Sequence, residues 1–106
     1  FDAVTSVSGS GPAYVYMFLN GMIKGGMEGG LTYEQAKAMA VNTVIGAAKL
    51  AKMSEIKLDD LIEMVCSKGG TTIEAVNIYR QKGLEDIIAE GIKACRKKSI
   101  LLSENL

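Results

Sequence analysis

Apolar residues recur along this chain at the spacing of helices, and the pattern predicts helical segments throughout. The first covers residues 12–28, where Pro12 suits a helix start because its φ is already fixed. Its first half, residues 13–19, is apolar nearly all round. A second helix is predicted to begin after Thr32, because Thr32 and Gln35 have the spacing of a capping box.

Three more helices are predicted in the second half of the chain. One covers residues 58–66, one follows a turn over residues 67–72 and continues to about Gln81, and one begins at Leu84. Gly83 is predicted to end the middle one, in the position where a glycine with positive φ is common. The last helix has acidic residues in its first turn and basic residues toward its end, which complements the helix dipole.

The two ends of the chain are expected to be less regular. Residues 1–11 are rich in Ser, Thr and Gly and are predicted to be a lead-in that ends in a turn, and residues 100–106 are expected to fray. No segment is confidently predicted to be a strand. The predicted fold class is therefore all-α, a bundle of about five helices in a single domain that covers residues 1–106.

The first two helices carry more apolar surface than a domain of this size can cover alone. Residues 13–19 are one example, and the second helix is another, because Val41, Ile45 and Ala48 lie opposite its main apolar face. A partner copy of the chain is the simplest source of cover. The pattern therefore predicts an oligomer.

Composition excludes several classes of function. Apolar residues make up 48% of the chain, which argues against disorder, and twelve basic residues balance twelve acidic ones. We therefore expect no binding to nucleic acid or to an anionic membrane surface. The longest apolar run is far shorter than the ~20 residues of a membrane helix, and no secretory leader is expected.

The chemistry available to the chain is limited. It has no histidine, and its two cysteines do not form a C-x-x-C motif. This predicts a reducing, cytoplasmic location, no metal site, and no nucleophile activated by histidine. Any catalysis must depend on hydroxyls, backbone N–H groups, a carboxylate or a cofactor.

The segment Cys66–Thr72 is the strongest candidate site. Its two glycines are predicted to fold the backbone back with positive φ, and the hydroxyls of Ser67, Thr71 and Thr72 are of the type that caps a helix start. A carboxylate or phosphate could bind to such a helix start. From residue types alone, an ordinary capped helix start is the simpler interpretation.

A second glycine-rich segment, Ser8–Pro12, invites comparison with a dinucleotide-binding fingerprint. The comparison fails, because Tyr14 occupies the position of the third glycine and no βαβ pattern surrounds it. Pattern alone therefore favours a tightly packed helix entry.

Four segments together resemble the C-terminal domain of pyrroline-5-carboxylate reductase, in the same order and at similar spacing. They are Asp2–Thr5, Ser8–Tyr14, Gly46–Lys49 and Cys66–Ile73. The resemblance implies a two-domain enzyme that reduces 1-pyrroline-5-carboxylate to L-proline with NADPH or NADH, the last step of proline biosynthesis. It also implies that a Rossmann domain, absent from this chain, binds the cofactor, while the helical domain forms an intertwined homodimer.

The resemblance also implies residue roles. The Thr72 hydroxyl is expected to face the imine nitrogen as the catalytic group. The substrate-binding residues are expected to be Ser67, Gly69, Gly70, Thr71, Thr72 and, more weakly, Glu55 from the partner subunit.

Further positions follow from the same resemblance. Ser10, Gly11 and Pro12 are expected to border the nicotinamide. Lys68 stands where the family typically has proline, which makes the turn less rigid and adds a positive charge.

Two other interpretations remain open at this point. The chain could be a non-catalytic helical dimerisation module, or the helical half of a related imine or hydroxyacid dehydrogenase. The homodimer could also be part of a larger assembly of dimers. In every case the isolated chain is expected to dimerise without turning over substrate.

Overall fold

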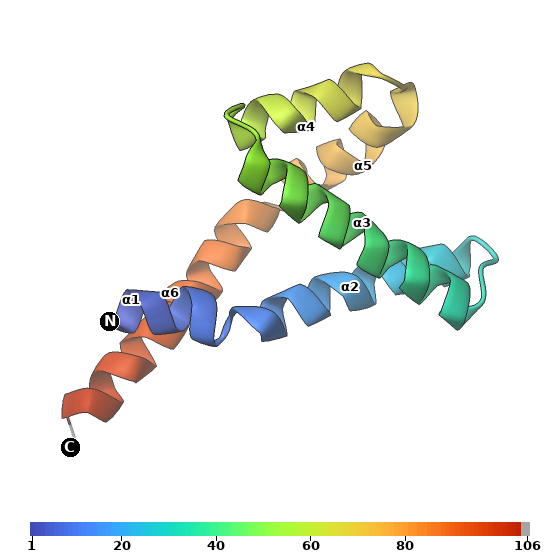
Figure 1. Ribbon diagram of the computed structural model, residues 1–106. Coiled ribbons are helices and arrows are strands. Elements are labelled where there is room, and N and C mark those ends of the chain that lie inside the picture. Colours follow the sequence, from blue (N-terminus) through green and yellow to red (C-terminus); the bar gives the residue numbers. More distant parts are fainter. Residues whose placement is uncertain (105–106) are drawn as a thin grey trace. The chain divides into compact units, whose positions relative to one another are not determined.

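The computed structural model describes residues 1–104, and all of its regular structure is helical (Figure 1). Five helices of ten residues or more confirm the all-α prediction. These helices start and end close to the predicted residues. The last helix, α6 (Leu84–Glu104), continues past Ile100 into the stretch that was expected to fray. Residues 105–106 of that stretch lie outside the described part. The elements are α1 (Asp2–Val4), the π-helix η1 (Thr5–Gly9), α2 (Gly11–Glu28), α3 (Tyr33–Met53), α4 (Leu58–Ser67), α5 (Gly70–Gln81) and α6 (Leu84–Glu104).

The N-terminal segment is helical, so the predicted lead-in with a turn is wrong. The Ser10 N–H donates to the Thr5 carbonyl at 2.9 Å. A bond to the carbonyl five residues earlier is the hydrogen bond of a π-helix. Ser6 is fully buried, and its hydroxyl donates to the Ala3 carbonyl at 2.9 Å. Both α1 and η1 pack on α6, and this contact between distant parts of the sequence outweighs the local turn preference.

Residues 13–58 form one compact unit, built mainly from α2 and α3. Its small core consists of Ile23, Ala36 and Ala40. Gly26 allows the close approach of the two helices, because a Cβ there would lie 3.2 Å from the Ala36 Cβ. Gly30 turns the chain between them with a φ of 104°, in the left-handed region that glycine adopts at little cost.

The predicted capping box at the start of α3 is confirmed. The Gln35 N–H donates to Thr32 Oγ1 at 3.1 Å, and the Thr32 N–H donates to Gln35 Oε1 at 3.0 Å. Two N–H groups that the helix itself leaves unpaired are thereby satisfied.

Replacing Thr32 with alanine is expected to lower the free energy of unfolding by about 0.5–2 kcal/mol, because the cap is lost. Urea denaturation followed by circular dichroism measures this change. Thr43→Ala is the matched control: the Thr43 hydroxyl donates to the Met39 carbonyl within α3, a bond whose loss costs little. Equal losses from the two substitutions would contradict the prediction.

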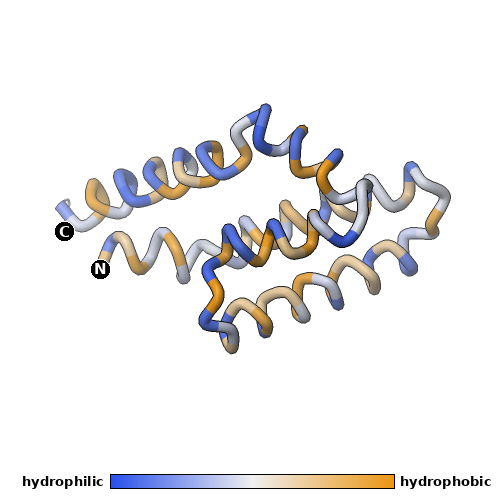
Figure 2. Tube along the Cα trace, turned by 90° about the horizontal axis from the view of Figure 1, so that it is seen from above, coloured by the Kyte–Doolittle hydropathy of each residue, from blue (hydrophilic) through white to orange (hydrophobic). Residues whose placement is uncertain are grey.

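Residues 1–12 and the described residues from 59 onward form the second compact unit. In it, α6 packs against α5 and against the N-terminal segment. Figure 2 shows this segment running beside α6, near the C-terminal end of the helix. Gly83 joins α5 to α6 with a φ of 72°, so its predicted role as the glycine that ends α5 is confirmed.

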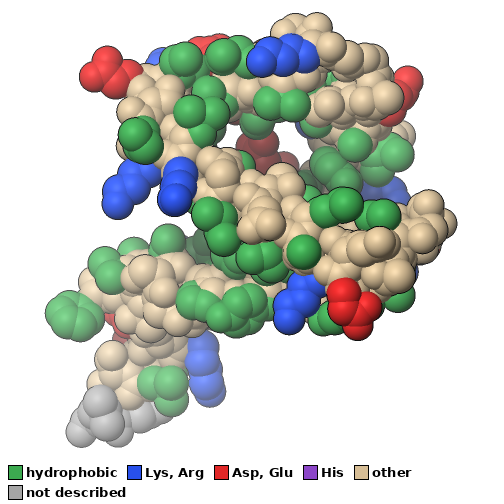
Figure 3. All heavy atoms as spheres, turned by 45° about the vertical axis from the view of Figure 1, so that its right-hand side comes forward, with side chains coloured by type: hydrophobic (Ala, Val, Ile, Leu, Met, Phe, Trp, Pro, Cys, Tyr) green, Lys and Arg blue, Asp and Glu red, His purple; other side chains and the backbone are tan. Residues whose placement is uncertain are grey.

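Large apolar side chains lie on the surface of the chain, and the space-filling view in Figure 3 shows many of them. In α2, Met17 is 73% exposed and Tyr16 is 64% exposed. In α3, Ile45 is 48% exposed. The described residues therefore do not enclose the apolar faces of α2 and α3 that were expected to be covered. No helix among residues 1–104 has the length and apolar character to cross a membrane.

Candidate substrate-binding site

The predicted substrate-binding segment forms the short connection from α4 to α5. Ser67 is the last residue of α4, and Gly70 is the first residue of α5. Gly69 between them has a φ of −170° and a ψ of 150°, which is extended backbone. Neither Gly69 nor Gly70 has a positive φ, so that prediction is wrong. An extended residue directly before a helix is sufficient here, because this is the usual conformation of an N-cap.

The hydroxyls of this segment do not cap α5, which also corrects the prediction. The N-cap is Gly69, which has no side chain, and no side-chain hydrogen bond caps the helix. The Ser67 hydroxyl instead donates back to the Met64 carbonyl at 3.0 Å, within α4. Thr71 and Thr72 already lie in the first turn of α5. The first N–H groups of this helix therefore have no side-chain acceptor and can bind water or an anion.

The segment is open to solvent. Ser67, Lys68 and Thr71 are exposed, whereas Thr72 is half-buried. The Lys68 N–H donates to the Val65 carbonyl at 3.3 Å, which continues the last turn of α4. A small ligand could reach the backbone N–H groups here without displacing a large side chain.

An ion pair links the two helices that flank this segment. Arg80 Nη2 in α5 lies 2.8 Å from Glu63 Oε1 in α4. The hydrogen bond to Glu63 raises the pKa of Arg80, so the guanidinium stays charged. Both side chains are about half exposed, and such pairs add little to stability. This pair could not be predicted from residue spacing, because its members lie 17 positions apart along the chain.

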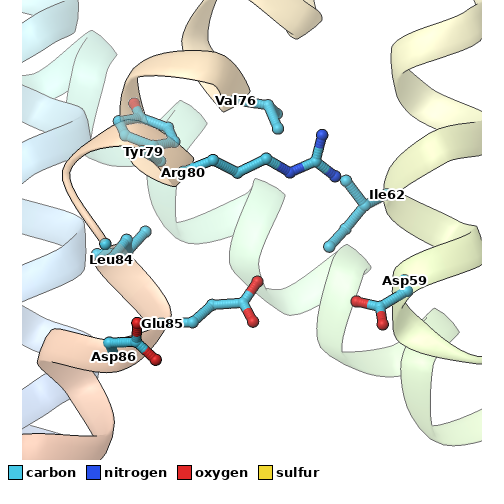
Figure 4. Close-up of a pocket in the computed structure, with 9 residues that line it drawn as sticks. Asp59, Ile62, Val76, Tyr79, Arg80, Leu84, Glu85 and Asp86 are labelled. Carbon is cyan, nitrogen blue, oxygen red and sulfur yellow. The ribbon is translucent and has the colours of Figure 1, made fainter.

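A cavity of about 550 Å³ lies beside this ion pair, between α4, α5 and the first turn of α6. Figure 4 shows Arg80 extending from α5 toward Ile62 of α4, while Glu85 of α6 and Asp59 of α4 lie below it in this view. None of the predicted site residues lines this cavity. Among residues 1–104, no three His, Cys, Asp or Glu side chains are grouped as a metal site requires.

The residues predicted to border the nicotinamide lie elsewhere in the same compact unit. Ser10 follows η1, and Gly11 and Pro12 begin α2. Ser10 and Cys95 line a second, open cavity of about 530 Å³. No residue of the Ser67–Thr72 segment lines either of these two cavities.

Glu55, the remaining predicted substrate contact, is exposed and follows α3. It belongs to the compact unit of residues 13–58, whereas the Ser67–Thr72 segment belongs to the other unit.

Comparison with known proteins identifies the family. Residues 1–102 match the family model described as pyrroline-5-carboxylate reductase dimerisation. The chain is 40% identical over 99 residues to a pyrroline-5-carboxylate reductase of Aquifex aeolicus and 41% identical over 102 residues to one of Escherichia coli K12. These matches cover 93% and 96% of this chain but only 37% and 38% of the two relatives. The chain thus spans little more than a third of their length.

Two solved structures match the fold of this chain. The crystal structure of the Plasmodium falciparum pyrroline carboxylate reductase with NADP bound matches with a TM-score of 0.88 at 30% identity, over 92% of this chain and 37% of that one. A pyrroline-5-carboxylate reductase from Coxiella burnetii matches with a TM-score of 0.90 at 30% identity, over 95% and 37%. With a family model that covers almost every residue, this chain belongs to the pyrroline-5-carboxylate reductase dimerisation family.

Proposed function

We propose that this chain is the substrate-binding and dimerisation part of a reductase that converts 1-pyrroline-5-carboxylate to L-proline with NADPH or NADH. The observation that carries the proposal is the start of α5, where a helix without a side-chain cap follows Gly69 in a member of this family. The substrate is a small carboxylate, which is the kind of group that such a helix start binds.

In this proposal the N–H groups of Gly70 and Thr71 hold the substrate carboxylate, and Gly69 lets the ligand approach the backbone closely. The Ser67 hydroxyl has one hydrogen, which it now donates to the Met64 carbonyl. It must therefore rotate away from α4 in order to donate to the carboxylate. The Thr72 hydroxyl, on the half-buried side of the same turn, contacts the ring nitrogen.

The proposed reaction requires little acid–base catalysis from the residues of this chain. Reduction of a polarised imine depends mainly on holding the ring in place, which N–H and hydroxyl donors can do without a histidine. The nicotinamide supplies the hydride when it is bound. Ser10, Gly11 and Pro12 offer one hydroxyl and the backbone polar groups of a helix start, which fits the edge of a nicotinamide but not a whole dinucleotide. The rest of the cofactor would be held by the remainder of the protein.

The proposed assembly is a homodimer, with an assembly of dimers as an extension, in the cytoplasm. The exposed apolar side chains of α2 and α3 support association with a second copy of this chain. The description of the matching family model names dimerisation, which supports the same proposal. Glu55 of the partner subunit is the proposed second contact to the ring nitrogen. Cys66 and Cys95 are not joined in a disulfide, which supports a reducing compartment.

The proposal is tested by joining this chain to the cofactor domain of the Escherichia coli relative, to which it is 41% identical. We expect the fusion to oxidise NADPH when 1-pyrroline-5-carboxylate is supplied, and the chain alone to bind L-proline without turnover. A fusion that dimerises but neither binds proline nor reduces the imine would favour the non-catalytic module. If the fusion instead reduces a keto acid to a hydroxyacid, the result would favour a related dehydrogenase.

A further inference from the structure

Two side-chain hydrogen bonds hold the N-terminal segment on α6. The Ser99 hydroxyl donates to Asp2 Oδ1 at 2.5 Å, and the Cys95 thiol donates to Ser10 Oγ at 3.4 Å. Cys95 and Ser99 lie one helical turn apart, so they share a face of α6. This face therefore fixes both ends of the N-terminal segment.

Ser10 lies between the end of η1 and the start of α2. Its N–H donates to the Thr5 carbonyl, which makes it the last residue held by the π-helix. Gly11 and Pro12 begin α2 directly afterwards. The position of Ser10 therefore sets where α2 begins.

The bond to Cys95 also sets what the Ser10 hydroxyl can do. Because the thiol donates, one lone pair of Ser10 Oγ is occupied, and the hydroxyl hydrogen stays available for another acceptor. Both residues are half-buried, so water competes less for this bond than it would at an exposed position. Without the thiol, the serine side chain could change freely among its three rotamers.

We propose that Cys95 is a positioning residue for the nicotinamide edge of the active site, a role that depends on the proposed function. Its thiol holds Ser10 in one rotamer, with the hydroxyl hydrogen directed away from α6 as a donor for the carboxamide of the cofactor. Cys95 itself does not touch the cofactor or the substrate. Its effect is therefore on cofactor affinity and not on the substrate carboxylate.

The test uses the two-domain fusion described above and measures the Kd for NADPH by fluorescence, in addition to kinetics. Cys95→Ala is expected to raise this Kd roughly two- to fivefold, which is the range for a weak S–H···O bond, while the KM for the imine stays unchanged. Cys95→Ser keeps a donor and is expected to recover most of the affinity. Lys93→Ala, at an exposed position of the same helix, is expected to leave the NADPH Kd unchanged.

The double variant decides whether Cys95 acts through Ser10. If it does, Ser10→Ala with Cys95→Ala binds NADPH no more weakly than Ser10→Ala alone. If the losses of NADPH affinity in the two single variants add up in the double variant, or if Cys95→Ala leaves the Kd unchanged, the inference is overturned. The proposed function still stands in that case, provided that the fusion reduces the imine. A fusion that binds NADPH but does not reduce the imine would instead count against the proposed function.

The contact itself is checked in the 106-residue chain. In a Cys66→Ser background, Ser10→Ala is expected to raise the rate at which Cys95 reacts with a disulfide reagent, because the thiol loses its acceptor. An unchanged rate would show that the thiol is not held by Ser10 in solution, which also overturns the inference.

Discussion

Thr72→Ala in the two-domain fusion is expected to lower kcat by roughly one to two orders of magnitude, because a hydrogen bond to a charged group contributes about 1–3 kcal/mol. The proposed partner of the hydroxyl is the ring nitrogen, whose charge changes during the reaction. An interaction that is stronger in the transition state than in the bound substrate lowers kcat when it is removed. Steady-state kinetics with 1-pyrroline-5-carboxylate as the varied substrate measures the effect.

Thr71→Ala is the matched control for this prediction. Thr71 lies in the same turn of α5 but is exposed, and its proposed contribution is its backbone N–H, which alanine retains. We therefore expect Thr71→Ala to change kcat by much less than Thr72→Ala. Similar kinetics for Thr72→Ala and the unmodified fusion would remove this hydroxyl from the mechanism.

Met17→Asp in α2 is expected to raise the dissociation constant of the dimer about 30-fold or more. Met17 is 73% exposed in the single chain, and its neighbour Phe18 is 48% exposed. If a second copy covers this surface, aspartate places an unpaired charge in an apolar contact, and a central interface residue is worth about 2 kcal/mol or more. Sedimentation equilibrium of the 106-residue chain measures the constant.

Lys97→Asp provides the control for this substitution. Lys97 lies on α6 and is exposed, and it is already charged, so its reversal does not place a new charge among apolar side chains. Circular dichroism shows whether each variant keeps its helices. A monomeric unmodified chain, or an equal effect of the two substitutions, would refute the assignment of α2 to the interface.

The helices could be predicted because their signals are local. The capping box at Thr32 and the glycine at Gly83 act within one turn of the residues that they serve, and both are confirmed. The N-terminal helices could not be predicted, because α1 and η1 depend on packing against α6 at the other end of the sequence. Likewise, Gly69 has the residue type of a positive-φ turn but needs only extended backbone here.

The candidate site was chosen from signals of the same local kind, and its role stays a prediction. The Cys66–Thr72 segment could be chosen from its glycines and hydroxyls, although the structure leaves those hydroxyls out of the cap. The Glu63–Arg80 ion pair and the Cys95–Ser10 bond join residues that no spacing rule connects. Cys95 is half-buried, and its thiol is hydrogen-bonded to a residue 85 positions away.

The hydrogen bond between Asp2 and Ser99 joins residues 97 positions apart. On the ribosome, the first residues of this chain therefore emerge long before the surface on which they pack has been made. The hairpin of α2 and α3 has its partners close by in sequence and can form early, as local contacts favour. The N-terminal segment must wait for α6, so a chain truncated before Ser99 would lack the hydroxyl that holds Asp2.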